Sequence, residues 1–119
     1  MHYLPRHLEQ QILESAKHFK AILLLGARQT GKRTLLSHLF PQNKTFVFDP
    51  IQDIYRARQD PDLFLDSFPA PLILDEVQYV PELLAALKRK MDQSESKGQY
   101  FLTGSQNFSI LRNVAESMA

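Results

Sequence analysis

One stretch of the sequence, GARQTGKRT at residues 26–34, constrains the fold of this chain more than any other. Its two glycines are separated by four residues, and a lysine follows the second glycine directly. An unbroken apolar run at residues 21–25 precedes the stretch, and a run with helical spacing at residues 34–40 follows it. A glycine-containing loop between a strand and a helix predicts a unit of an α/β protein with a mostly parallel sheet.

The same stretch has the residues that hold a phosphate group. The two glycines let the backbone curl so that its N–H groups face an anion, and the next helix adds a partial positive charge. Lys32 can reach the β- and γ-phosphates of a nucleotide, as in a P-loop or Walker A motif. A plain strand-to-helix turn is the alternative, but it needs neither the lysine nor this spacing. The predicted nucleotide-binding residues are Gly26, Ala27, Arg28, Gln29, Thr30, Gly31, Lys32, Arg33 and Thr34. For Arg28 an outward-facing side chain is the alternative.

Arg33 departs from the P-loop pattern, which places serine or threonine directly after the lysine to bind Mg²⁺. An arginine side chain has only donors, and its positive charge repels a cation at close range. Thr34 cannot simply substitute, because one helical step rotates it by roughly a third of a turn. Arg33 either turns outward or lies on the phosphates. Both arrangements predict nucleotide binding with a doubtful Mg²⁺ site and slow hydrolysis.

A second motif, LILDE at residues 72–76, reads as a buried strand that ends in two adjacent carboxylates. In parallel α/β sheets ligands lie at the carboxyl ends of the strands. Asp75 is therefore predicted to hold Mg²⁺ (the Walker B acid) and Glu76 to be the catalytic base, with Lys32 the other catalytic residue. A solvated loop or a helix cap is the alternative. Thr103 and Ser105 follow another strand, where their hydroxyls either lie beside the γ-phosphate or cap the strand end.

Short apolar runs alternate with helical patterns along the chain, which predicts an α/β fold. The expected architecture is a P-loop NTPase-like three-layer α/β/α sandwich. We expect strands at 21–25, 45–48, 72–76 and 99–103, and helices at 7–19, 34–40, 82–91 and 108–118. Residues 51–67 are predicted to form one or two short helices, broken at Pro61.

Composition narrows the class of protein. The chain has 119 residues, the length of one domain, and a net charge of +1, so neither nucleic acid nor an anionic membrane is indicated as a partner. It has no cysteine, which fits a reducing compartment. No apolar run approaches the roughly 20 residues of a membrane span, and the N-terminus lacks the features of a signal peptide. We therefore expect a cytoplasmic protein without a membrane partner.

Three segments in order, GARQTGK, LILDEVQ and FLTGSQ, resemble a group of bacterial and archaeal AAA+-type P-loop ATPases. In that group an N-terminal ATPase core precedes a C-terminal domain of unknown function. The resemblance implies ATP and Mg²⁺ as cofactors, with Lys32 on the phosphates, Asp75 on the metal and Glu76 as base. It implies that the turn from Thr103 to Ser105 is a sensor of the nucleotide.

The resemblance also implies a sheet in the order five-one-four-three-two. Residues 1–119 then resemble a partial core, truncated before the fifth strand and the lid. Without that strand, residues 21–25 would be an open apolar edge, which predicts self-association. The missing region could bind a protein or DNA partner.

Three functions follow from these motifs and stay open at this point. The first is an ATPase core that binds ATP through residues 26–34 and hydrolyses it slowly with Asp75 and Glu76. The second is a nucleotide-binding switch, or pseudo-ATPase, without turnover. The third is an ATPase helper in DNA transactions, which the near-neutral charge does not support.

Overall fold

The protein is built on a four-stranded parallel sheet in the order β1-β4-β3-β2. The structure is a computed structural model that describes residues 6–26 and 31–105. The strands are β1 (Ala21–Leu25), β2 (Lys44–Val47), β3 (Leu72–Asp75) and β4 (Tyr100–Gly104). Each predicted strand is confirmed to within one residue at either end. The order one-four-three-two that the resemblance implied is confirmed as well.

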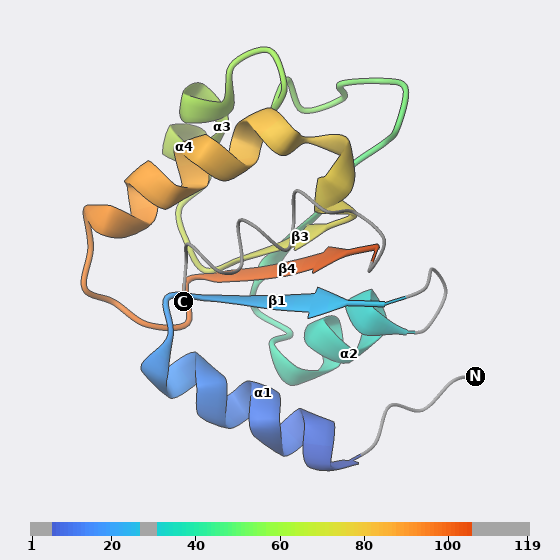
Figure 1. The fold of residues 1–119 in the computed structure, drawn as a ribbon, viewed down its shortest axis with the longest axis vertical. Helices are drawn as coiled ribbons and strands as arrows, with labels where there is room; N and C mark the ends of the chain where they lie inside the picture. The colour runs from blue at the N-terminus through green and yellow to red at the C-terminus, as the bar shows by residue number, and fades with distance from the viewer. Residues whose placement is uncertain (1–5, 27–30, 106–119) are drawn as a thin grey trace.

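Helices cover both faces of this sheet (Figure 1). The helices are α1 (Arg6–His18), α2 (Lys32–Leu39), α3 (Pro61–Ser67) and α4 (Pro81–Asp92), with a 3₁₀ turn η1 (Val77–Tyr79). Figure 1 shows α1 and α2 on one side of the strands and α3 and α4 on the other. The predicted three-layer α/β/α fold is therefore confirmed. The helix predicted at 108–118 lies outside the described residues. Within the described part of the chain, no helix has the length and apolar content that crossing a membrane requires.

The two faces of the sheet bury separate apolar clusters, because successive residues of a strand point to opposite sides. Ile73 and Phe101 pack with the side chains of α1 and α2. Their neighbours in the strands, Leu74 and Leu102, pack with those of α3 and α4. The central strands β3 and β4 are buried along their whole length, whereas β1 and β2 are only partly buried. A strand covered on both faces is mostly apolar, which explains the runs LIL and YFL, and the buried polar residues Asp75 and Thr103 come only toward the carboxyl ends of these strands.

The connection from β2 to α3 differs from the prediction. Residues 51–60 are turns rather than a helix, and Ile51 and Ile54 are 84% and 60% exposed. The Asp53 carboxylate accepts hydrogen bonds from the backbone N–H groups of Arg58 and Gln59. Aspartate side chains that bind nearby backbone groups compete with the helix for the same donors. The apparent apolar face of this segment is therefore a coincidence of spacing.

Helix α3 begins at Pro61, where the prediction placed a break. Asp60 caps this helix, because its side chain accepts a hydrogen bond from the backbone N–H of Leu63 at 3.2 Å. Proline is well tolerated at the first helical position, since its missing N–H group would have no partner within the helix. Pro61 therefore starts the helix that carries the buried Phe64 onto β2.

Candidate functional site

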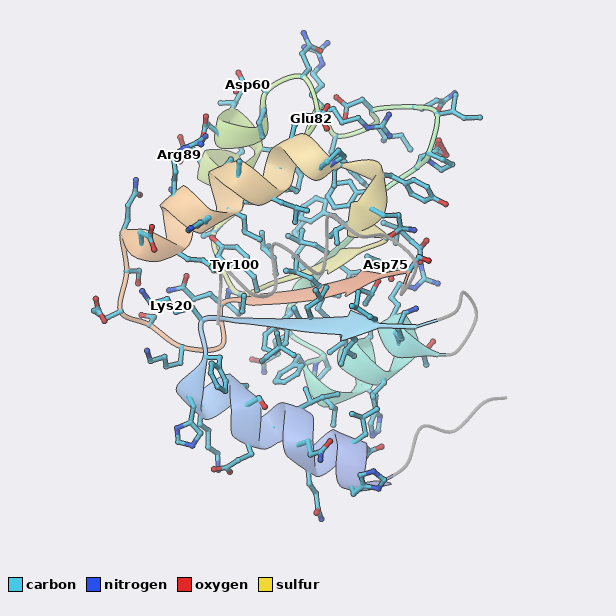
Figure 2. The ribbon with its side chains drawn as sticks, viewed as in Figure 1. Lys20, Asp60, Asp75, Glu82, Arg89 and Tyr100 are labelled. Atoms are coloured by element: carbon cyan, nitrogen blue, oxygen red, sulfur yellow. The ribbon has the colours of Figure 1, made fainter. Side chains whose placement is uncertain are left out.

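The predicted site residues that the structure describes lie at the carboxyl ends of β1, β3 and β4. Leu25 pairs with Gly104, so β1 and β4 end side by side. The N–H group of Gly26 donates to the carbonyl oxygen of Gly104 at 3.1 Å, which holds the start of the glycine loop against the end of β4. Figure 2 shows Asp75 at the end of β3, on the same edge of the sheet. The topology therefore brings together three motifs that are far apart in the sequence.

Lys32 is the first residue of α2, and its side chain reaches back to Gly26 at the end of β1. Gly31, before it, has φ 83° and ψ 14°, the left-handed conformation that glycine adopts without strain. The Lys32 Nζ atom donates to the carbonyl oxygen of Gly26 at 2.7 Å, and the side chain is only 8% exposed. Burial lowers the pKa of this ammonium group, and the negative charges of Glu76 and Asp75 partly oppose that shift. The cation therefore lies within electrostatic reach of the acid pair.

The rest of the predicted loop is divided between described and undescribed residues. Ala27, Arg28, Gln29 and Thr30 lie outside the described residues. Arg33 and Thr34 are in the first turn of α2, and both are exposed. The positive charge of Arg33 contributes to lowering the pKa of Asp75, so the guanidinium group acts on the site electrostatically.

Asp75 is buried at the tip of β3, with 7% of its surface exposed. Burial raises the pKa of its carboxyl group. The hydrogen bond from Thr103 lowers this pKa, the charge of Glu76 raises it, and the charges of Arg33 and Lys32 lower it. A carboxyl group whose pKa is raised by burial at the edge of a site is typical of functional positions.

Thr103 links the two acids across the sheet. It is fully buried, and its hydroxyl donates to Asp75 Oδ1. The same hydroxyl oxygen accepts a hydrogen bond from the backbone N–H of Glu76 at 3.0 Å. A threonine hydroxyl has one proton, and here that proton is directed at Asp75. Thr103 therefore orders the acid pair from the neighbouring strand. Ser105, two residues further on, is partly exposed at the same edge.

Glu76 adopts a left-handed backbone conformation, with φ 66° and ψ 48°, directly before the turn η1. A residue other than glycine is uncommon there, and such outliers concentrate at functional sites. The Glu76 carboxylate accepts a hydrogen bond on Oε2 from Gln78 Nε2 at 2.8 Å. Gln78 is not among the residues that the sequence motifs predict for the site. The signal available was a polar side chain two residues after the acid pair.

The side chains present fit Mg²⁺ only in part. Mg²⁺ commonly keeps several waters and takes one or two carboxylates together with phosphate oxygens, and Asp75 supplies one such carboxylate. Arg33 supplies no lone pair where a hydroxyl is usual. Within residues 6–26 and 31–105, no group of three or more histidine or acidic side chains is placed to hold a metal. Binding of Mg²⁺ would therefore depend on the phosphates of a bound nucleotide.

Comparison with known proteins places the chain in a family. Residues 18–119 match the AAA domain family. The chain is similar to the uncharacterized protein Mb2031c of Mycobacterium bovis and to the uncharacterized protein Rv2008c of Mycobacterium tuberculosis. Each is 28% identical over 99 residues, which cover 82% of this chain and 22% of the relative. The chain thus spans about a fifth of the length of these curated relatives. No solved structure gives a significant match.

The matched region contains Lys32, the acid pair, and the hydroxyls of Thr103 and Ser105 at the end of β4, and the fold brings them to one edge of the sheet. AAA ATPases generally bind ATP together with Mg²⁺. On the family match and the fold together, the chain belongs to the AAA domain family, as an AAA-type P-loop ATPase core.

Proposed function

We propose that this protein binds ATP through residues 26–34 and hydrolyses it slowly with Asp75 and Glu76. The observation that carries the proposal is the position of Lys32. Its ammonium group is partly buried beside Gly26, and the negative charges of Glu76 and Asp75 raise its pKa against the effect of burial. A buried lysine that contacts a backbone carbonyl can exchange that contact for phosphate oxygens, to which charge-assisted hydrogen bonds are stronger. Phosphoryl transfer needs this kind of positioned charge more than covalent chemistry from the protein.

In the proposed reaction, the oxygen of a water molecule bonds to the γ-phosphorus of ATP. The bond from that phosphorus to the oxygen bridging the β- and γ-phosphates breaks, and ADP leaves with the electron pair. Glu76 takes the proton of the attacking water. Lys32 stabilises the charge on the phosphate oxygens, and Asp75 would hold Mg²⁺ through its hydration shell. The metal, when bound, neutralises charge on the β- and γ-phosphates.

A second candidate is a nucleotide-binding switch without turnover, and Arg33 favours it. Arg33 stands at the motif position of a metal-binding serine or threonine, and its charge acts on Asp75. Arg33 would then replace part of the charge of Mg²⁺ on the phosphates, with less need for the metal. The third candidate, a helper in DNA transactions, has no support from the net charge of +1.

An ATP titration beside a hydrolysis assay tests these functions. We expect calorimetric ATP binding by the wild type and none by Lys32→Ala. Thermal stabilisation by ATP should be lost in the variant as well; it amounts to about 2.7 kcal/mol at a hundred times the Kd. Lys88→Ala, which removes an exposed lysine from α4, is the matched control. Equal stabilisation of wild type and Lys32→Ala would refute the P-loop assignment. Binding without release of phosphate would favour the switch.

Self-association is a further proposal about partners. Strand β1 has β4 on one side, and among the described residues no strand pairs with its other side. Its residues AILLL include no charge or proline, whereas the opposite edge strand β2 begins with the exposed Lys44. Open apolar edges invite pairing with another chain, and lysine discourages it. Light scattering should therefore show a mass that rises with concentration, and Leu25→Lys should reduce that rise. Exchange of the last predicted helix, the other route to a dimer, concerns undescribed residues.

A further inference from the structure

The turn that follows the acid pair is anchored in the core on both sides of Gln78. Val77 and Val80 are fully buried, and they pack in the cluster beneath α4. Backbone hydrogen bonds close the turn, from Tyr79 N–H to the Glu76 carbonyl at 3.2 Å and from Val80 N–H to the Val77 carbonyl at 3.0 Å. The backbone of Gln78 is therefore held in place relative to Glu76, independently of any ligand.

The side chain of Gln78 is turned toward the acid. Its Nε2 atom donates to Glu76 Oε2 at 2.8 Å. The opposite orientation of the amide would place the carbonyl oxygen Oε1 against a carboxylate oxygen, and two acceptors repel. The network therefore assigns the NH₂ group to the side that faces Glu76. One of the two carboxylate oxygens is thus tied to a neutral donor.

This orientation leaves the other end of the amide without a hydrogen bond. The Oε1 atom of Gln78 is buried and has no partner among the described residues. Burial of an acceptor without a partner is unfavourable, and such groups in native structures call for an explanation. The contact with Glu76 is maintained in spite of that cost, which points to a role for the amide at the site.

We infer that Gln78 is a positioning residue for the catalytic base, an inference that rests on the proposed hydrolysis. By holding Oε2, it orients the carboxylate so that the other oxygen takes the proton of the attacking water. A base that is itself oriented by a third group is a recurring arrangement in enzymes. Here the backbone of Glu76 is fixed by Thr103 from the neighbouring strand, and its side chain is fixed by Gln78 from the following turn. Both parts of the base are therefore held before ATP binds.

The first test is Gln78→Met, which keeps the length of the side chain and removes the donor. We expect kcat to fall by about 10- to 100-fold, the effect of losing one hydrogen bond to a charged group, with an unchanged Kd for ATP. Gln93→Met, at an exposed position after α4, should have wild-type kinetics. A wild-type kcat in Gln78→Met overturns this inference and leaves the proposed ATPase function intact.

A double-mutant cycle with Glu76→Gln separates positioning from a general structural role. If Gln78 acts through Glu76, then adding Gln78→Met to Glu76→Gln lowers the residual rate no further. A full additional loss in the double variant overturns the inference. If the wild type binds ATP without turnover, the hydrolytic part of the proposed function and this inference fail together. The two kinds of failure are therefore distinguishable.

A measurement without ATP tests the contact even if the Gln78 variant does not fold. In wild-type ¹⁵N–¹H spectra, the assigned side-chain NH₂ signals of Gln78 should shift in Glu76→Gln, because the charged acceptor has become neutral. The corresponding signals of Gln93 should stay in place. If the Gln78 signals do not move, the contact does not exist in solution and the inference is overturned.

Discussion

The segments that follow β2 and β3 at the carboxyl edge of the sheet each begin near an aspartate, and the two carboxylates have different hydrogen-bond partners. After β2, Asp49 accepts hydrogen bonds from the backbone N–H groups of Ile51 and Gln52 at 2.7 and 2.8 Å. At the end of β3, Asp75 is buried and accepts a hydrogen bond from Thr103, 28 residues away. The first carboxylate organises its own loop. The second is held by another strand, away from its own backbone.

The pKa values of the two carboxyl groups are shifted in opposite directions. The backbone N–H groups of Gln52 and Ile51 lower the pKa of Asp49. Burial raises the pKa of Asp75 despite nearby positive charges. A carboxylate satisfied by local donors stabilises the fold, whereas one that is buried at some cost is poised to bind a ligand. Whether the donors of an aspartate come from its own loop or from another strand therefore distinguishes a structural carboxylate from one at a site.

The largest expected contrast between the two connections is in catalysis. Glu76→Gln should retain ATP affinity and lose about 10²- to 10⁴-fold in hydrolysis rate, because the proton acceptor is removed. Asp53→Asn, the matched change in the connection after β2, should leave the rate unchanged, since its carboxylate accepts hydrogen bonds from the backbone N–H groups of its own loop. Single-turnover phosphate release and an ATP titration measure both quantities. If Glu76→Gln loses ATP binding instead, the residue has a structural or metal-binding role.

Arg33→Thr should convert the site at the end of β3 toward the usual metal-binding form. The change removes a positive charge that acts on Asp75 and adds a hydroxyl able to bind Mg²⁺. We expect hydrolysis and apparent Mg²⁺ affinity each to rise by roughly tenfold, since a ligand is gained and a repulsion is lost. Titration of Mg²⁺ at saturating ATP gives both values for wild type and variant. A variant that gains neither rate nor metal affinity contradicts this account of Arg33.

Asp75→Asn should stabilise the protein in the absence of nucleotide. The folded-state pKa of Asp75 is raised above the ordinary value of 3.8, so ionisation at neutral pH costs stability that a neutral amide does not lose. Asparagine keeps an oxygen that can accept the hydrogen bond of Thr103. The Tm should therefore rise by a few degrees at pH 7, and the gain should shrink as the pH falls toward 3.8. A lower Tm at pH 7 would show that the carboxylate is stabilised by its cationic neighbours.

Much of this site could be predicted because its residues lie at strand ends, and strand ends are visible as breaks in apolar runs. Lys32, Asp75, Glu76 and Thr103 were each placed on a loop or strand tip from the sequence, and the parallel topology brings them to one edge. Their roles toward ATP and Mg²⁺ stay predictions. The link from Thr103 to both acids was not predicted, since it depends on the pairing of β3 with β4 at side-chain resolution.

Other features of the fold depend on hydrogen bonds that compete with helix formation, and the spacing of apolar residues does not reveal them. The spacing of Ile51 and Ile54 favours a helix, but the Asp53 carboxylate binds the backbone donors that a helix would need. Pro61 reads equally well as a break or as a first helical residue, and the cap from Asp60 decides between them. Glu76, which accepts the hydrogen bond of Gln78, has a left-handed backbone conformation that sequence rules assign mainly to glycine.

The smallest effect expected is at Asp49, and its sign is opposite to that at Asp75. The folded-state pKa of Asp49 is lowered below the ordinary value of 3.8, so its contribution to stability is present above that value. This contribution is lost as the pH falls through the folded-state pKa. Asp49→Ala should therefore have a lower Tm than the wild type at pH 7, and the difference should narrow below about pH 4.

Thermal scans from pH 7 to pH 2.5 measure the effect at Asp49, with Asp49→Asn as the control. Asparagine can still accept hydrogen bonds from the N–H groups of Ile51 and Gln52, so its loss at pH 7 should be smaller. Both variants should bind ATP as the wild type does, because this carboxylate is directed at its own loop. A Tm difference that does not change with pH would mean that the charge of Asp49 contributes nothing to the turn. If either Asp49 variant loses ATP affinity, the connection after β2 belongs to the binding site, and the two loops do not differ in function.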